Sequence, residues 1–270
     1  MPRQLASPIS KTDSIRRRAV ALPSGLTMHP SGSLLVADRD NHAIRQLALD
    51  AAADTVYFSQ FADGEGFAST LLLVNPSSVE PTTGTVEFRD SLGQPLAVDL
   101  NGALVLGNYM FNLAPGGSAW LRTDGLGTLV VGSVKITSDI PIRSTLLFSG
   151  FLGLGGLDAA RPASQLRIPF ETDDAQYLDT GVAFSNPASV PVSISLRLRD
   201  TDRNLVEGGA ANIVLPARGQ LARFPRELFA GKPPGLGRFR GTLEVDASTP
   251  ICAMALRLSP GALVPLPVIR

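Results

Sequence analysis

The chain has 270 residues, of which 44% are hydrophobic and 18% are charged, a composition that favours packed cores and argues against global disorder. Its 24 Lys and Arg residues equal its 24 Asp and Glu residues, so it lacks the positive charge expected of a dedicated nucleic-acid binder. No apolar run approaches the roughly 18–20 residues of a membrane helix. We therefore expect no nucleic-acid partner and no insertion into a membrane.

The start of the chain is polar, and residues 1–13 are predicted to be a disordered lead-in. Basic residues near this end are not followed by the apolar segment of about 7–15 residues that a secretory signal contains. The expectation is therefore either that the protein is cytoplasmic or that Met1 is not the start of the parent gene.

Residues 14–55 predict a small β unit followed by a linker. Apolar runs at 25–28, 33–37 and 43–47 predict three short strands. The first turn between them contains Pro and Gly, which favour tight turns because Pro pre-sets φ and Gly accepts a positive φ.

This segment resembles an NHL repeat, the blade of a β-propeller, over residues 14–47. The residues that match are Pro23, Gly25, Leu26, Pro30, Gly32, Val36-Ala37-Asp38, Asn41-His42 and Ile44-Arg45. The segment departs from the family at His29, where Asp is usual, and at Leu35, where an aromatic residue is common. Because a propeller closes with roughly 4–8 blades, the resemblance implies that this blade is the remnant, and the last blade, of a longer parent.

The rest of the chain contains one pattern twice. Residues 71–90 and 181–200 each hold an apolar run ending in Asn-Pro, a polar turn, an alternating run and a closing Arg-Asp. We therefore predict one repeat over 56–149 and a second over 167–270. The Gly- and Ala-rich residues 150–166 between them are predicted to be a linker.

Each repeat contains about seven short runs separated by turn residues, which predicts an all-β fold with two tandem Ig-like or fibronectin-like β-sandwich domains. One short helical turn is expected within 224–229. Alternation predicts that nine apolar residues face the cores: Val74, Val86, Phe88, Trp120, Val134, Ile136, Phe184, Leu196 and Leu243.

The two repeats resemble the tandem Ig-like modules that follow NHL propellers in large bacterial surface or secreted proteins. The shared motifs are a Phe before an acidic loop, Asn-Pro after an apolar strand, and Gly-Thr or Gly-Ser near the end. The resemblance implies an extracellular or cell-surface location and a structural role, and it identifies no ligand.

Nothing in the sequence marks a catalytic site, so we expect no enzyme activity and no cofactor. The two histidines, His29 and His42, lie in turns of the blade, and neither a Gly-x-Ser-x-Gly elbow nor a Ser-x-x-Lys pattern is present. The spacings that bind zinc are also missing. Cys252 lies in an apolar run and is predicted to be a buried, inert thiol.

Metal binding is not predicted, but calcium has weak candidates. Asp63, Glu65, Asp173 and Asp174 lie in acidic loops at corresponding places in the two repeats. Residues 200–204 begin like a calcium loop, but Leu205 stands where the required Gly would be and Ala211 where the bidentate Glu would be. Solvated loops and hairpin turns explain both patterns more simply.

Two further patterns in the sequence bear on anion binding. Residues 153–156 are glycine-rich but lack the Lys-Ser/Thr of a phosphate-binding loop. A local cluster of basic residues suggests either a solvated face or a site for an acidic glycan or another domain: Arg223, Arg226, Lys232, Arg238 and Arg240.

The function expected from the sequence is a non-catalytic structural, adhesion or spacer module outside the cytoplasm, in the C-terminal part of a larger propeller protein. The alternative is a carbohydrate- or protein-binding accessory region of a larger secreted enzyme, so a protein or a glycan is the partner class left open. A third, weaker hypothesis is a hydrolase that uses a carboxylate pair at the domain junction.

Overall fold

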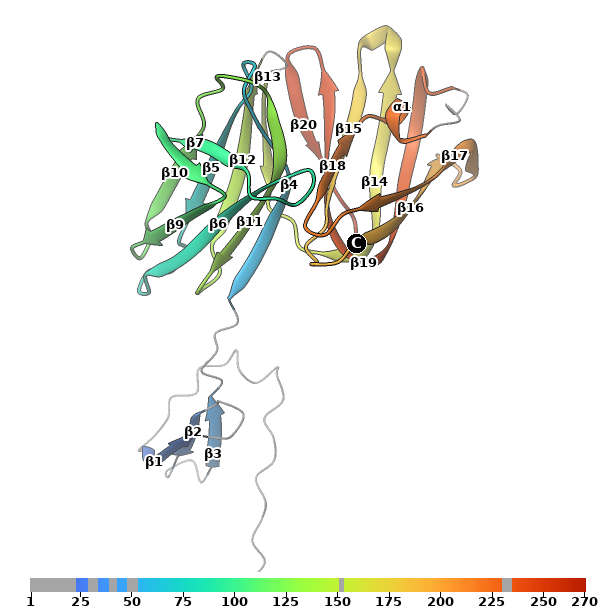
Figure 1. Ribbon diagram of the computed structural model, residues 1–270. Coiled ribbons are helices and arrows are strands. Elements are labelled where there is room, and N and C mark those ends of the chain that lie inside the picture. Colours follow the sequence, from blue (N-terminus) through green and yellow to red (C-terminus); the bar gives the residue numbers. More distant parts are fainter. Residues whose placement is uncertain (1–22, 29–33, 39–42, 48–52, 151–152, 230–234) are drawn as a thin grey trace, which may run out of the picture. The chain divides into compact units, whose positions relative to one another are not determined.

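The computed structural model describes residues 23–28, 34–38, 43–47, 53–150, 153–229 and 235–270. The chain divides into two compact units, Met1–Ala53 and Asp54–Arg270. In both units most of the described residues lie in β-strands, and helix is nearly absent (Figure 1). The prediction of an all-β protein is confirmed, with several sheets whose arrangement is consistent with β-sandwich packing.

The first unit contains one antiparallel sheet with the order β1-β2-β3. Its strands are β1 (Pro23–Met28), β2 (Leu34–Asp38) and β3 (Ala43–Leu47). The three predicted strands are therefore present, each within two residues of its expected start. His29 and His42 lie outside the described residues.

The first half of the second unit, residues 54–158, is called the first module here. One of its sheets has the order β4-β11-β6-β9 and another has the order β10-β5-β12-β13, beside a separate β7-β8 hairpin. The strands are β4 (Asp54–Asp63), β5 (Ala68–Val74), β6 (Thr82–Asp90), β7 (Ala97–Leu100), β8 (Ala103–Leu106), β9 (Asn108–Leu113), β10 (Ser118–Arg122), β11 (Val130–Ser138), β12 (Arg143–Gly150) and β13 (Gly153–Asp158).

The second module, residues 163–270, repeats this strand order. Its elements are β14 (Ala163–Asp173), the 3-10 turn η2 (Asp174–Gln176), β15 (Asp179–Ser185), β16 (Val192–Asp200), β17 (Leu205–Leu215), β18 (Gln220–Arg223), α1 (Pro225–Leu228), β19 (Arg238–Ser259) and β20 (Ala262–Leu266). The expected helical turn within 224–229 is confirmed as α1.

The long strand β19 corresponds to two strands of the first module, β11 and β12. Its first part pairs with β14 and β16, as β11 pairs with β4 and β6. Its second part pairs with β15 and β20, as β12 pairs with β5 and β13. The registers agree as well, because Gly132 lies opposite Phe61 and Asp90 while Gly241 lies opposite Phe170 and Asp200. The duplication seen in the sequence is thus also a duplication of strand pairing.

Each module has its own apolar core. Seven of the nine residues predicted to face the cores are buried: Val86, Phe88, Val134, Ile136, Phe184, Leu196 and Leu243. The prediction was wrong for Val74 and Trp120, whose exposed fractions are 37% and 60%. In each strand an adjacent leucine is buried instead, Leu73 in β5 and Leu121 in β10. Successive side chains of a strand point to opposite faces, so only one of two adjacent apolar residues can enter the core.

The segment predicted to be a linker, 150–166, instead contributes strand β13 and the start of β14. Its glycines permit a close approach between β13 and β20, which lie side by side at the module junction (Figure 1). A Cβ on Gly155 would lie 2.6 Å from Cβ of Leu263, a distance that requires the strands to shift. The glycines therefore have a packing role at this contact.

The repeated Asn-Pro motif fixes the loops at one end of each module. Asn75 is fully buried, and its Nδ2 donates to the carbonyl oxygens of Glu80 at 2.8 Å and Ala114 at 3.1 Å. Asn186 is 2% exposed, and its Nδ2 donates to those of Val190 at 2.8 Å and Pro216 at 2.9 Å. In both modules one buried amide thus joins two loops that are distant in sequence.

Candidate functional site

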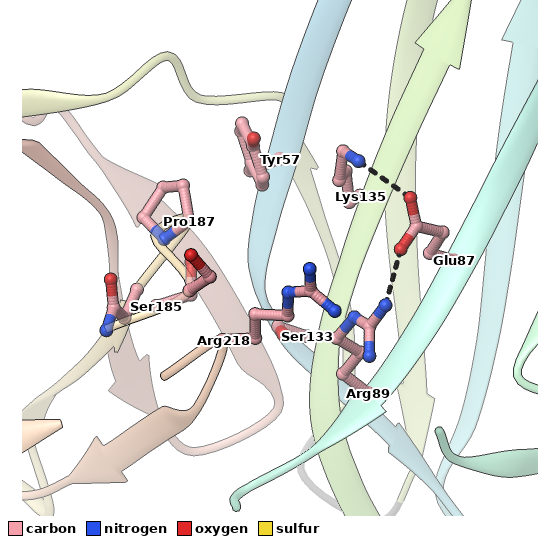
Figure 2. A pocket seen from close by; sticks show the side chains of 10 residues that line it. Tyr57, Glu87, Arg89, Ser133, Lys135, Ser185, Pro187 and Arg218 are labelled. Carbon is pink, nitrogen blue, oxygen red and sulfur yellow. Dashed lines mark hydrogen bonds and ion pairs between the residues drawn. The ribbon is translucent and has the colours of Figure 1, made fainter. Parts of the chain in front are cut away.

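A polar cleft of about 310 Å³ lies where the second module faces the sheet β4-β11-β6 of the first. Figure 2 shows the side chains that line it. They come from three strands of the first module and, in the second, from the end of β15 and two loops: Tyr57, Glu87, Arg89, Ser133, Lys135, Ser185, Asn186, Pro187, Ser189 and Arg218.

The alternation of side chains along β4, β6 and β11 explains why the first module's lining residues face the cleft. Val86, Phe88, Val134 and Ile136 point into the core and are at most 1% exposed. The residues between them therefore point outward from the sheet. Antiparallel pairing sets Lys135 of β11 opposite both Glu87 of β6 and Tyr57 of β4, and Ser133 opposite Arg89. The polar face of the cleft is thus a direct consequence of the register.

Glu87 joins the two cations on this face. Lys135 Nζ donates to its Oε1 at 2.7 Å, and Arg89 Nη2 donates to its Oε2 at 2.7 Å (Figure 2). Burial by itself would raise the pKa of Glu87, but the hydrogen bonds from Lys135 and Arg89 outweigh burial and leave that pKa below its usual range. Burial also raises the pKa of Tyr57, so its phenol keeps its proton at neutral pH.

The second module supplies a third cation, Arg218. This residue lies in the turn between β17 and β18, and its guanidinium points toward Arg89 (Figure 2). Two hydrogen bonds position this turn. Asn186 Nδ2 donates to the carbonyl oxygen of Pro216, and the N–H of Arg218 donates to the carbonyl oxygen of Ala188 at 2.9 Å. Among the described residues, no carboxylate pairs with Arg218.

Buried polar contacts join the modules beside the cleft. The hydroxyls of Ser59 and Ser185 lie 2.9 Å apart, and Gln220 Nε2 donates to Gln60 Oε1 at 2.6 Å. The backbone N–H of Gln220 also donates to the carbonyl oxygen of Ser91 at 3.1 Å. These contacts hold the two walls of the cleft together.

The cleft suits the binding of an anion. Three cationic side chains line it, and among the described lining residues Glu87 is the single carboxylate. Sequence reasoning missed this site. The alternation of Glu87 with Arg89, and of Ser133 with Lys135, marks an outward polar face, but nothing in the sequence indicates that Arg218 would lie against it.

The calcium candidates of the first module are not brought together with other ligands. Asp63 is 7% exposed, and its Oδ1 accepts a hydrogen bond from the N–H of Gly125 at 3.0 Å. Glu65 lies in the following turn with a positive φ of 53° and is exposed. Asp63 thus caps a loop through a backbone amide.

The candidates of the second module have protein partners. Asp173 caps η2, accepting from the N–H of Ala175 at 3.1 Å and from Gln176 Nε2 at 3.0 Å. Asp174 pairs with Arg226, whose hydrogen bond lowers the pKa of that carboxyl group. Within the described parts of the chain, no group of three or more His, Cys, Asp or Glu residues is placed to hold a metal ion.

The turn at 200–204 is an Asx-type hairpin turn. Asp200 Oδ1 accepts from the N–H groups of Asp202 at 2.9 Å and Asn204 at 2.8 Å. Asp90 does the same for Leu92 and Gln94 in the first module. Backbone capping therefore explains the acidic residue in both copies.

The predicted basic cluster is largely balanced by carboxylates. Lys232 lies outside the described residues, and the remaining cations form four ion pairs: Arg223–Glu227, Arg226–Asp174, Arg238–Asp173 and Arg240–Glu171. The cluster is therefore mostly a set of surface ion pairs, which are worth little individually.

Cys252 is fully buried in β19, as predicted. Burial raises the pKa of its thiol to about 12. The thiol therefore stays protonated at neutral pH, where the reactive thiolate is nearly absent.

No helix in the described residues is both long enough and apolar enough to cross a membrane.

The sequence also suggested a hydrolase with a carboxylate pair at the domain junction. In the cleft at this junction Glu87 is paired with cations and not with a second carboxylate. Its two oxygens are held by Lys135 and Arg89.

The comparison with protein families identifies one match, in which residues 21–47 fit the model of the NHL repeat. This match confirms the resemblance of the first unit to an NHL repeat. It covers only a small part of the chain. No curated protein matches the sequence.

Two solved structures align with most of the chain. A chain of the infectious bursal disease virus Gx strain is 16% identical, with a TM-score of 0.17. A chain of the T13 IBDV viral particle is 14% identical, with a TM-score of 0.16. Each alignment covers 90% of this chain, and they cover 67% and 64% of the viral chains. This chain thus spans about two thirds of their length, and at such TM-scores the likeness carries no argument about fold or function.

Proposed function

We propose that residues 54–270 form a non-catalytic structural unit, a spacer or adhesion module, in the extracytoplasmic part of a larger protein that also contains a propeller. The observation that carries this proposal is the junction between the modules. Met254 and Ala183 of the second module are buried in the apolar core cluster of the first. An interface of that kind makes two modules behave as one rigid body, which a spacer requires.

The NHL repeat supports the larger setting. One three-stranded blade cannot close a propeller, which packs about 4–8 blades around an axis. We therefore propose that further blades complete the first unit.

We also infer that both modules are Ig-like variants. In the Ig fold the second and fifth strands share one sheet, while the third and sixth share the other. Here β5 pairs with β10 and β6 pairs with β11, and the second module has the same pairs. The seven strands counted here leave out the β7-β8 hairpin and β13. The variation lies in the outer strands, since the first strand β4 joins β11, the fourth strand β9 joins β6, and the seventh strand β12 joins β5.

A glycine substitution at the junction tests the rigid unit. In the wild-type chain we expect nitrogen-15 NMR relaxation to give both modules one rotational diffusion tensor. Gly155→Ala should separate the modules' motions and lower stability by roughly 1–3 kcal/mol, because overpacking forces β13 away from β20. The matched control is Gly156→Ala, whose Cβ would meet the tip of Leu147, within the first module, at 3.0 Å. Independent tumbling of the modules in the wild type would contradict the proposal.

A second candidate function, carbohydrate binding, is favoured by the exposure of Trp120. Its side chain is 60% exposed on the outer face of the sheet, in a row with Leu72, Thr145 and Asp158 on the neighbouring strands. An exposed indole beside hydroxyl and carboxylate groups offers a stacking surface with hydrogen-bonding neighbours.

Calorimetric titration with a panel of neutral oligosaccharides tests this second function. We expect saturable binding to the wild type and a loss of about tenfold or more in Trp120→Ala, which corresponds to at least 1.4 kcal/mol. Val131→Ala serves as the control, since it shortens another partly exposed apolar residue on a different sheet. Equal binding by all three proteins would exclude Trp120 as the sugar platform.

A further inference from the structure

We propose that the cleft between the modules binds an oxyanion group, such as a sulfate or phosphate, and that Arg218 is its principal specificity-determining residue. This inference goes beyond the structural role proposed above. It rests on the convergence of three cations, on the internal comparison of the two modules, and on the backbone conformation of Arg218.

The cleft carries an excess of positive charge in a chain that is neutral as a whole. Glu87 offsets one of the two cations on its own face, and the second module adds Arg218 rather than an acidic partner. Like charges that converge in a partly enclosed space repel one another. An oxyanion between Arg89 and Arg218 converts this repulsion into charge-assisted hydrogen bonding.

The corresponding face of the second module contains one more carboxylate than the cleft does. Arg197 pairs there with Asp246, and Arg199 Nε lies 2.9 Å from Glu244 Oε2. Glu244 occupies the register position of Lys135, opposite Arg197, while Lys135 lies opposite Glu87. Arg167, which lies opposite Glu244 on β14, is the third cation of that face, so three cations face two carboxylates there, whereas the cleft has three cations and one carboxylate.

The conformation of Arg218 is a separate observation. Its φ is 58°, in the left-handed region that disfavours non-glycine residues. The corresponding turn of the first module has Gly116 at this place, with a φ of 67°. Both residues donate their N–H to the loop after the Asn-Pro motif, to Ala188 and Ser77 respectively. The second module therefore has a strained arginine at the position where the first module has glycine, which indicates a role for the arginine side chain.

Hydroxyl groups complete the site. Ser133, Ser185 and Ser189 line the cleft together with the protonated phenol of Tyr57. Hydroxyls donate hydrogen bonds to oxyanions without adding charge. The cavity volume of about 310 Å³ is near the lower limit of about 300 Å³ for small-molecule sites, so the ligand is the free oxyanion or its ester on a single sugar-sized group.

An NMR titration of the full chain tests the proposal. Sodium sulfate, sodium phosphate and glucose 6-sulfate are added at constant ionic strength, and the backbone amide shifts of Ser133 and Ser189 are followed. We expect saturable shifts with at least one probe. A sulfated sugar that binds more tightly than inorganic sulfate identifies the ester as the ligand, and equal affinities identify the free anion.

Three variants separate binding from folding. Arg218→Gly installs the residue of the first module and relieves the strained φ, so the melting temperature should not fall, while affinity should drop about tenfold or more. Glu87→Gln removes the competing carboxylate and should strengthen binding. Arg122→Ala removes an exposed cation of the first module outside the cleft and should leave binding unchanged. Absence of saturable binding in the wild type, or equal affinity in wild type and Arg218→Gly, would overturn the proposal.

Discussion

Replacing Asn75 with Asp should destabilise the second unit by about 3–5 kcal/mol at pH 7, the range expected when a buried charge has no partner. Asn75 Nδ2 donates to carbonyl oxygens of two different loops. In the wild type, Asn75 Oδ1 accepts a hydrogen bond from the N–H of Ser77 at 3.0 Å. An Asp would retain this bond with one carboxylate oxygen, but its other oxygen would face the two carbonyl oxygens and repel them. Urea unfolding followed by circular dichroism measures the loss.

The pH dependence of this variant provides an internal check. Burial near carbonyl oxygens raises the pKa of the new carboxyl group in the folded state above its unfolded value of about 3.9. Its penalty is therefore smallest below that unfolded pKa, and it grows as pH rises toward the folded pKa. Asn75→Ala, which should cost roughly 1–3 kcal/mol by leaving carbonyls unpaired, has no such titration. A difference between the two variants that does not change between pH 4 and pH 7 would contradict the assigned contacts.

Phe88→Ala should cost roughly 3–5 kcal/mol, the usual range for removing a buried aromatic ring. Phe88 is 1% exposed, and its ring meets that of Phe61 edge to face, with centroids 5.1 Å apart and an interplanar angle of 63°. The substitution removes both the buried area and this ring contact, and neighbouring strands restrict collapse of the cavity. Chemical denaturation of the full chain measures the effect.

Trp120→Ala is the matched control for Phe88→Ala. It removes a larger aromatic side chain from the same module, but one that is 60% exposed. We expect its cost to be within about 0.5 kcal/mol, as for surface substitutions outside special features. If both variants cost the same, or if Phe88→Ala cost less than about 1 kcal/mol, the assignment of Phe88 to the core would be wrong.

Much of the local structure follows from the sequence. Alternating polar and apolar residues identify β6, β11 and β16 because the side-chain period of a strand is two. The repeated Asn-Pro and Arg-Asp motifs locate the corresponding turns of both modules, whose hydrogen bonds then prove equivalent. The NHL repeat is recognisable from residues at fixed spacing and is matched independently at 21–47.

Other features depend on contacts between distant segments. Trp120 and Leu121 are adjacent and both apolar, and the register of β10 with β5 decides which of them is buried. Residues 153–158 read as a flexible linker because glycine is common in linkers. Their strand structure comes from pairing with β12 and from the close approach of β20. The local sequence of these residues indicates neither contact.

The sequence by itself determined the all-β class, the duplicated strand pattern and the blade, since these depend on spacings within short segments. The tertiary structure alone decided the cleft. Glu87, Arg89 and Lys135 meet through strand pairing, and Arg218 reaches them only because the modules dock through Ser59–Ser185 and Gln60–Gln220. Charge complementarity across such a junction is a property of separations in space, and residues more than 80 positions apart carry no mark of their proximity in the sequence.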